Sequence, residues 1–272
     1  MGTKIVLQAC VEQSVECLVY TSTMDVANTL AGSIVNGTEE SVTVPSTQHF
    51  FPVYSTTKYE AEKMVLDANE TELENGKKLT TCALRPCGIY GEGDRLLGES
   101  LAVFVNAGIG FLIGEPTGKS QYAYAGNIAL AHVLAAKTLL WPSVNDPICG
   151  RAFFLGDHTP RESIGKIMEP FATELSVKMA TIIPPYWLMY TIGLLLTAFC
   201  WIVSFFKYVD IPFHAVVVRY LYAEYTYSWE AAKRALDYEP KYTYEDGFAR
   251  SMVFYKHLLG IDQKTEENKK KK

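Results

Sequence analysis

Short apolar runs alternate with amphipathic stretches along most of the chain. Residues 17–21 form a brief, largely apolar run, as do residues 79–84 and 152–155, and each run predicts a strand buried within a sheet. Residues 3–14 and 126–140 instead carry apolar side chains three and four positions apart, which predicts helices with one buried face. Strands that alternate with helices across short breaks indicate a parallel α/β sheet.

Other segments are expected to be helices or loops from their caps and breakers. The region 24–52 has no regular period and is acidic around Glu39 and Glu40, so we expect a long loop there. Gly91, Gly93 and Gly98 also predict a loop, because their spacing is not that of a phosphate-binding turn. Further helices are predicted at residues 54–68, 99–107, 228–236 and 243–257.

One stretch departs from this alternation. Residues 186–206 contain no charged side chain, follow Pro184–Pro185 and precede Lys207. A bilayer-spanning helix needs about 20 apolar residues, often with tryptophan and tyrosine near its ends, and Trp187 and Trp201 fit that pattern. The alternative is a buried core helix, but such helices are usually shorter. The length and uniform apolarity favour membrane association.

Composition excludes several classes of function. The chain has 272 residues, of which 49% are hydrophobic and 20% charged, as in a globular protein. Its formal net charge of −5 gives no basic field, so we expect no nucleic-acid partner. The six cysteines form no C-x-x-C pair or Cys/His cluster with metal spacing, so we expect no metal site. They read as small core residues in a reducing compartment.

The most informative polar pattern is Tyr54 with Lys58, four positions apart on a predicted helix. At this spacing the two side chains share one helix face, and an ammonium favours the phenolate form of a neighbouring tyrosine. The strand at 17–21 leads into Ser22 and Thr23, whose hydroxyls could hold a substrate oxygen against the phenol. The alternative is an ordinary surface pair, because this spacing is common by chance.

A series of motifs in a fixed order strengthens the first interpretation. They are residues 18–23 (LVYTST), 54–58 (YSTTK), 82–93 (CALRPCGIYGEG), 124–129 (YAGNIA) with His132, and 232–240 (AKRALDYEP). In order and approximate spacing the chain resembles the 3β-hydroxysteroid dehydrogenase branch of the extended short-chain dehydrogenases. The resemblance runs through nearly all of the chain. It implies a Rossmann-like doubly wound parallel sheet and oxidation of a steroid or sterol 3β-hydroxyl by NAD or NADP.

The resemblance also implies a role for each site residue. Tyr54 would remove the hydroxyl proton, and Lys58 would lower the pKa of Tyr54 and hold the nicotinamide ribose. Thr23 aligns with the family's catalytic Ser/Thr and would bind the substrate oxygen, with Ser22 as the second candidate. The backbone from Pro86 through Ile89 would face the nicotinamide.

Two departures from the family pattern limit this reading. No G-x-x-G-x-x-G or G-x-G-x-x-G occurs, so the turn that cradles the cofactor pyrophosphate is missing, and we expect a sheet truncated at its N-terminal side. Many family members also isomerise a Δ5 double bond with a tyrosine that falls at Phe153 here. Asp157 matches a second, acidic residue implicated in that step. Since phenylalanine has no proton to give, isomerisation is doubtful.

The expected organisation has three parts. Residues 1–160 would form the C-terminal part of a Rossmann-like NAD(P)-binding domain, residues 161–262 a substrate-binding region that includes the apolar segment, and residues 263–272 a disordered basic tail. Because dehydrogenase-like sequence lies on both sides of the apolar segment, we expect a monotopic or re-entrant contact with the membrane. Lys269 and Lys270 resemble a di-lysine retrieval signal, which indicates the endoplasmic reticulum membrane with the catalytic part facing the cytosol.

Alternative functions remain open from the sequence. One is a sterol 3-dehydrogenase that decarboxylates at C4, and another is a non-catalytic, membrane-docked remnant that lacks cofactor binding. The sequence also leaves open the steroid, the choice between NAD and NADP, and whether the chain forms a homo-oligomer.

Overall fold

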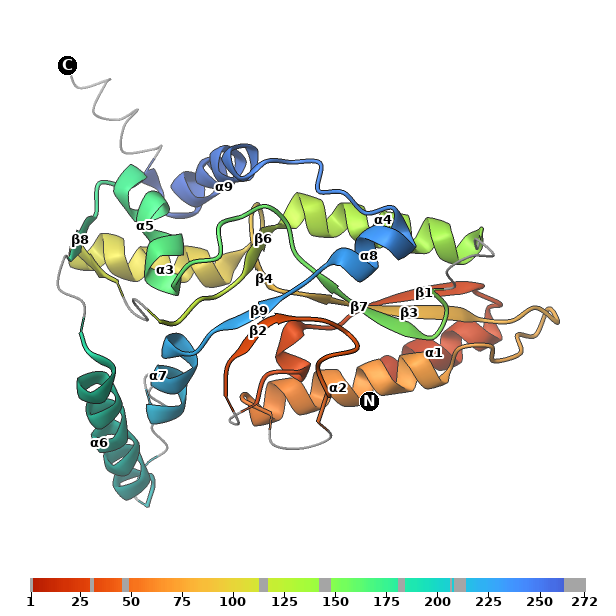
Figure 1. The fold of residues 1–272 in the computed structure, drawn as a ribbon, viewed down its shortest axis with the longest axis horizontal. Helices are drawn as coiled ribbons and strands as arrows, with labels where there is room; N and C mark the ends of the chain where they lie inside the picture. Colours follow the sequence, from red (N-terminus) through yellow and green to blue (C-terminus); the bar gives the residue numbers. More distant parts are fainter. Residues whose placement is uncertain are drawn as a thin grey trace. The chain divides into compact units, whose positions relative to one another are not determined.

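A computed structural model describes residues 2–29, 32–45, 49–112, 117–141, 148–180, 184–205, 207 and 214–261 (Figure 1). The helices are α1 (Gly2–Glu12), α2 (Pro52–Asp67), α3 (Arg95–Ala107), α4 (Ala125–Leu140), α5 (Ile164–Glu174), α6 (Tyr186–Ser204), α7 (Ala215–Tyr222), α8 (Glu230–Leu236) and α9 (Tyr244–Leu258), with a 3-10 turn, η1, at Met24–Val26. The strands are β1 (Cys17–Thr21), β2 (Ile34–Gly37), β3 (Thr80–Pro86), β4 (Gly88–Tyr90), β5 (Ile109–Phe111), β6 (Tyr122–Tyr124), β7 (Arg151–Leu155), β8 (Lys178–Ala180) and β9 (Tyr225–Tyr227).

The central sheet has the order β1-β3-β7, and both pairings are parallel. Val19 lies opposite Cys82, and Leu84 opposite Phe153, so the carboxyl ends of the three strands meet at one edge of the sheet. β1 is an edge strand of this sheet. The predicted α/β class with a Rossmann-like parallel sheet is therefore confirmed.

Helices cover both faces of the sheet. α2 and α4 both contact β1 and β3 (Figure 1), with α2 on the same side as α1 and α4 on the other. The core between them is apolar and closely packed, because β3 is buried along nearly its whole length. Its fully buried members include Val65, Leu84, Ala131, Ala135 and Phe153.

The chain divides into two units that alternate along the sequence. The first holds residues 1–89, 122–159 and 227–247, and the second holds residues 90–121, 160–226 and 248–272. The boundary expected near residue 160 coincides with one of these crossings. Sequence patterns did not indicate the others, because three of them lie in or beside the short strands β4, β6 and β9 and one lies inside α9, with no change of composition.

In the second unit, α3, α5 and α9 pack around Phe171, whose ring contacts Tyr90, Phe248 and Tyr255. The loop expected around Gly98 is wrong, because α3 already begins at Arg95. Asp94 caps that helix by accepting bonds from the N–H groups of Leu96 and Leu97. Gly98 is buried, and a side chain there would meet Leu258.

The apolar segment forms α6, which packs against α7 as a helical hairpin. Gly193 permits the close approach, since an added Cβ would lie 2.8 Å from the backbone nitrogen of Ala215. Only 6% of the apolar window in α6 is buried, which is unlike the core helix considered as an alternative. Phe206 and the basic tail at 263–272 lie outside the described residues.

The long loop expected at 24–52 is also partly wrong. It contains η1 and the short strand β2, which pairs with β9 from the far end of the chain. A strand of four residues offers too few positions for its alternation to stand out, and its partner is remote in sequence.

Candidate active site

The carboxyl end of β1 presents Thr21, Ser22 and Thr23 in turn. The Ser22 N–H donates to the Leu84 carbonyl at 2.7 Å, which continues the β1–β3 ladder by one residue. Thr23 then caps η1, its hydroxyl oxygen accepting from the Asp25 N–H at 3.2 Å. Thr23 and Ser22 are both buried, and among the described residues the Ser22 hydroxyl has no hydrogen-bond partner.

Tyr54 extends from the first turn of α2, which Pro52 starts at a position where its missing N–H costs nothing. The phenol is 48% exposed, and the Thr23 hydroxyl lies near enough to it to lower its pKa. Burial raises the pKa of Tyr54, the Thr23 hydroxyl lowers it, and the Asp25 carboxylate raises it, with a net upward direction. The structure therefore joins the predicted acid/base and the predicted oxygen-binding hydroxyl.

Lys58 lies one turn further along α2 but binds the strand rather than the phenol. Its Nζ donates to the Thr21 carbonyl at 2.5 Å and lies 4.8 Å from the ring centre of Tyr20. Burial lowers the pKa of Lys58, and the nearby Glu62 carboxylate raises it. The expectation that Lys58 depresses the pKa of Tyr54 is not met, because burial dominates the pKa of the phenol and the Lys58 ammonium is held at the Thr21 carbonyl.

One turn beyond Lys58, Glu62 forms a buried ion pair with Arg85 of β3. The pair is bidentate, with Nε to Oε2 at 3.0 Å and Nη2 to Oε1 at 2.6 Å. The guanidinium also lies 5.2 Å from the ring centre of Phe154. Since Arg85 immediately precedes Pro86, this pair joins the helix that carries Tyr54 and Lys58 to the strand end expected to face the nicotinamide.

Pro86 and Ile89 follow at the same edge of the sheet. Pro86 pairs with Leu155 at the end of β3, and the Cys87 N–H donates to the Leu155 carbonyl at 3.1 Å. β4 then pairs with β6, where Gly88 lies against the Tyr122 ring. Ile89 is 37% exposed, whereas Pro86 and Cys87 before it are buried.

Asp157 has a structural role that its alignment did not indicate. Its carboxylate accepts from the Tyr124 N–H, the Asn127 amide and the Thr159 N–H at 2.8, 2.8 and 2.9 Å. These bonds anchor the first turn of α4 to the end of β7. Phe153 is fully buried in the middle of β7. The three bonds give the Asp157 carboxylate a part in the packing of the fold.

His132 is hydrogen-bonded rather than solvent-facing. Its Nδ1 lies 2.8 Å from the Ile128 carbonyl oxygen and its Nε2 lies 2.7 Å from Thr21 Oγ1. Because a carbonyl only accepts, Nδ1 carries the proton in the neutral ring and the Thr21 hydroxyl donates to Nε2. Thr21 thus connects α4 on one face of the sheet to Lys58 on the other.

Comparison with known proteins decides the family. Residues 1–184 match the model of the 3-beta hydroxysteroid dehydrogenase/isomerase family, which covers the whole Thr23–Tyr54–Lys58 site. The chain belongs to this family. The motifs from LVYTST to YAGNIA lie within the matched part, and the resemblance deduced from them is confirmed.

Several solved structures share the fold of this member of the 3-beta hydroxysteroid dehydrogenase/isomerase family. UDP-glucose 4-epimerase from Thermotoga maritima with UDP-glucose has a TM-score of 0.61 at 14% identity, over 95% of this chain and 69% of that one. UDP-glucuronic acid 4-epimerase from Bacillus cereus, in complex with UDP-glucuronic acid and NAD, has 0.58 at 14%, over 94% and 66%. RMD from Pseudomonas aeruginosa complexed with NADPH has 0.61 at 13%, over 94% and 72%. This chain thus spans about two thirds of their length.

The family implies a nicotinamide dinucleotide, and the described residues fit one end of it. Tyr54, Lys58 and the backbone after Pro86 meet at the carboxyl edge of the sheet, where such a ring and its ribose bind. The pyrophosphate end finds no matching cradle among the described residues. β1 enters η1 through Ser22 and Thr23 without a glycine, and the N-terminus of α3 is already occupied by the Asp94 carboxylate.

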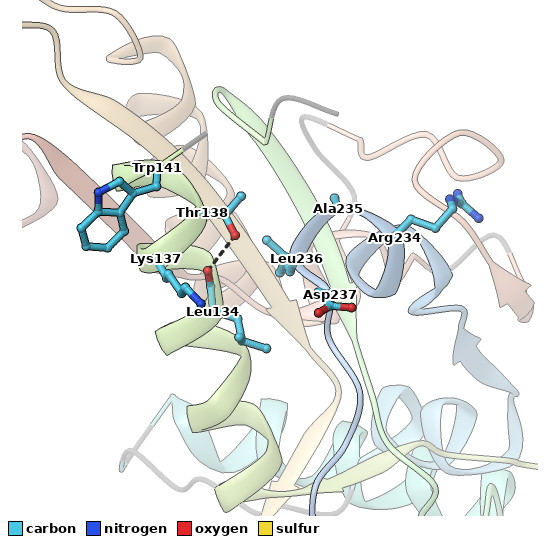
Figure 2. A pocket seen from close by; sticks show the side chains of 8 residues that line it. All are labelled: Leu134, Lys137, Thr138, Trp141, Arg234, Ala235, Leu236 and Asp237. Carbon is cyan, nitrogen blue, oxygen red and sulfur yellow. Dashed lines mark hydrogen bonds between the residues drawn. The ribbon is translucent and has the colours of Figure 1, made fainter. Parts of the chain in front are cut away.

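A hollow of about 290 Å³ lies elsewhere in the first unit, between α4 and the end of α8. Figure 2 shows Leu134 and Lys137 of α4 on one side, Leu236 and Asp237 on the other, and Arg234 directed away from them. The Thr138 hydroxyl donates to the Leu134 carbonyl at 2.9 Å. Since the start of α4 is anchored at the carboxyl end of β7, this hollow lies toward the opposite end of the strands from Thr23 and is not the catalytic site.

Proposed function

We propose that this protein oxidises the 3β-hydroxyl of a steroid or sterol with NAD or NADP. The observation that supports the proposal best is the placement of the Thr23 hydroxyl beside the Tyr54 phenol, with Lys58 one turn away, in a chain of the 3-beta hydroxysteroid dehydrogenase/isomerase family. The Thr23 and Tyr54 hydroxyls could both bond the oxygen of an alcohol substrate. This arrangement suits removal of the proton from the substrate hydroxyl.

Each residue has a defined part in this mechanism. The Thr23 hydroxyl binds the substrate oxygen and orients the alcohol toward Tyr54. The Tyr54 phenolate takes the hydroxyl proton as the carbonyl forms, and the Lys58 ammonium would hold the ribose of the cofactor. NAD(P)+, when bound, supplies the acceptor for the hydride that leaves the carbinol carbon. The backbone from Pro86 to Ile89 orients the nicotinamide.

Isomerisation of a Δ5 double bond is not part of the proposal. That step moves a proton between two carbon atoms and needs a side chain that can donate and accept it. Phe153 has no such group, and the Asp157 carboxylate is engaged by three donors in the fold. We therefore expect the 3-ketone with its double bond unmoved to be the product.

The test is turnover by the detergent-purified chain with 3β-hydroxysteroids and millimolar NAD+ or NADP+, followed by the absorbance of the reduced cofactor and by product analysis. Tyr54→Phe removes the acid/base and should lower turnover by about 10²–10⁴-fold. Tyr59→Phe on the same helix is the matched control and should retain activity. Near-normal turnover by Tyr54→Phe would refute the assignment.

The same assay separates the alternatives. Turnover with release of CO₂ from a 4-carboxysterol, and none of a simple 3β-hydroxysteroid, would identify a C4-decarboxylating sterol dehydrogenase. Sterol binding without turnover under any cofactor condition would identify a non-catalytic remnant.

We further propose that the α6–α7 hairpin docks the protein on the endoplasmic reticulum membrane, with the catalytic part on the cytosolic side. The 19 residues of α6 rise about 28 Å, close to the thickness of a bilayer core. Its exposed side chains include Trp187, Leu195, Phe199, Trp201 and Ile202. Apolar surface of this extent on one element is stabilised by lipid contact.

The hairpin geometry supports a one-sided arrangement. The Tyr222 hydroxyl at the end of α7 donates to the Pro184 carbonyl before α6 at 2.5 Å, and the Tyr222 and Tyr186 rings lie 5.5 Å apart. The chain therefore leaves and returns at the same end of α6. The di-lysine motif that favours the endoplasmic reticulum lies outside the described residues.

A further inference from the structure

Asn28 is completely buried, and its polar groups serve two different segments of the site. Its side-chain amide donates to Asp25 Oδ1 at 2.8 Å, and its main-chain carbonyl accepts from the Phe50 N–H at 3.0 Å. The Tyr227 hydroxyl donates to Asn28 Oδ1 at 2.5 Å. A buried amide used in this way fixes the relative positions of all the groups it bonds.

The bond to Asp25 leads to Thr23. The Asp25 carboxylate accepts from the Thr23 hydroxyl at 3.3 Å, and the Asp25 N–H donates back to that hydroxyl at 3.2 Å. The position of the Asp25 carboxylate therefore sets the orientation of the Thr23 hydroxyl, which in turn contacts Tyr54.

The bond to Phe50 leads to Tyr54, the other member of the Thr23–Tyr54 pair. Phe50 is buried two residues before α2 begins, its ring contacts Phe51, and the Phe51 carbonyl accepts from the Ser55 N–H at 2.8 Å. Tyr54 lies in that first turn of α2. Asn28 is thus joined to both members of the Thr23–Tyr54 pair, through η1 on one side and through the start of α2 on the other.

Tyr227 holds Asn28 from a remote part of the chain. Its ring is buried and stacks on Phe154 with centroids 4.2 Å apart, and the next residue, Ser228, donates its N–H to the Gly37 carbonyl at 2.8 Å. The stacking on Phe154 and the backbone bond from Ser228 to Gly37 hold the Tyr227 ring in place without its hydroxyl. Removing the hydroxyl alone should therefore release Asn28 while leaving the ring in place.

We propose that Asn28, held by Tyr227, is a positioning residue that fixes the Thr23 hydroxyl against the Tyr54 phenol. The proposal rests on the proposed dehydrogenase function for its effect on turnover. Its structural part does not, because the bonds from Asn28 to Asp25 and Phe50 are present without substrate.

The test combines hydrogen exchange with a double-mutant cycle on the full chain. In Tyr227→Phe and in Asn28→Ala, amide exchange of residues 23–28 and 49–51 should quicken by about fivefold or more. Turnover should fall about tenfold at unchanged steroid KM, because a misaligned Thr23 hydroxyl no longer stabilises the transition state. In a Thr23→Ala background, Tyr227→Phe should have little further effect on turnover.

Tyr238→Phe is the matched control. Tyr238 is as buried as Tyr227, and its hydroxyl donates to the Gly156 carbonyl at 3.0 Å, so this variant removes a comparable bond with no path to Thr23. Exchange at residues 23–28 should be unchanged in it. Unaltered exchange in Tyr227→Phe, or a turnover loss that persists in the Thr23→Ala background, would overturn the proposal. A wild type without dehydrogenase turnover would refute the proposed function and leave the exchange result to decide the role of Asn28.

Discussion

The phenol of Tyr54 is the group whose protonation controls the proposed reaction. Its pKa is raised by burial and by Asp25, more than the Thr23 hydroxyl lowers it. As a base it must be deprotonated, so kcat/KM for alcohol oxidation should increase with pH up to about the ordinary tyrosine value of 10 or beyond. Asp25→Asn removes the charge that opposes the phenolate and should shift the rising limb to lower pH.

The measurement is a pH–rate profile at saturating cofactor, with circular dichroism at each pH to exclude unfolding. A plateau near neutral pH in the wild type would show that another group is the base. An unchanged profile in Asp25→Asn would show that the Asp25 carboxylate does not affect the pKa of Tyr54.

The Glu62–Arg85 pair should contribute strongly to stability. Both side chains are at least nine-tenths buried, with 3% and 10% of their side-chain surface exposed, so Glu62→Ala leaves an unpaired cation in the interior. We expect a loss of about 3–5 kcal/mol in the free energy of unfolding, whereas Glu62→Leu combined with Arg85→Met should cost much less. Urea titration of both variants measures the difference.

The matched control for that pair is the exposed bridge between Lys77 and Glu16, 2.6 Å long with 62% and 41% of the side chains exposed. Lys77→Ala should cost under about 1 kcal/mol. Equal losses from the buried and the exposed pair would contradict the assigned role of Arg85.

For individual side chains, the sequence was most informative where spacing alone fixes geometry. Tyr54 and Lys58 share a helix face because they are four residues apart. Asn28 carries no such signal, since its partners come from residues 25, 50 and 227, and only the fold brings these together. The direction of the Tyr54 pKa was also missed, because desolvation depends on tertiary burial and not on sequence neighbours.

Among the elements, the α6–α7 hairpin permits a sharp test of membrane topology. With tags at Met1 and Lys272 in sealed microsomes, both should be cut by protease added from the cytosolic side. The protein should sediment with the microsomes and be released by detergent rather than by high salt, because the attraction is mainly apolar. Protection of one tag alone would establish a single span and contradict the hairpin arrangement.

Long elements and the strands of the central sheet were predicted well, and the shortest peripheral strands were not. The helices at 126–140 and 186–206 have enough residues for periodicity or length to be decisive, and the structure places helices at 125–140 and 186–204. β2, β8 and β9 have three or four residues each, and α5 contains Pro170, a residue that normally ends a helix. Such elements are stabilised by their partners in the fold rather than by local preference.

The sequence and the fold both predict weak binding of NAD+. These 272 residues contain no glycine turn of the kind that holds a pyrophosphate. Each missing bond to a charged phosphate is worth about 1.5–3 kcal/mol. We therefore expect NAD+ to bind far more weakly than at micromolar concentration.

Isothermal titration calorimetry with NAD+ and with nicotinamide mononucleotide checks this expectation. If only the nicotinamide and its ribose are held, the two ligands should bind with similar affinity. Micromolar binding of NAD+, well above that of the mononucleotide, would mean that the described residues form a pyrophosphate site in a manner unlike a glycine turn.

The position of β1 at the edge of its sheet has a consequence for handling the protein. Cys17–Thr21 contains neither a charged residue nor a proline, the usual protections of an exposed strand edge. In the part of the chain that the structure describes, its outer backbone groups are a template for another strand, including that of a second molecule. For a protein of these residues we therefore expect concentration to favour pairing of β1 between molecules, which light scattering over a concentration series would measure.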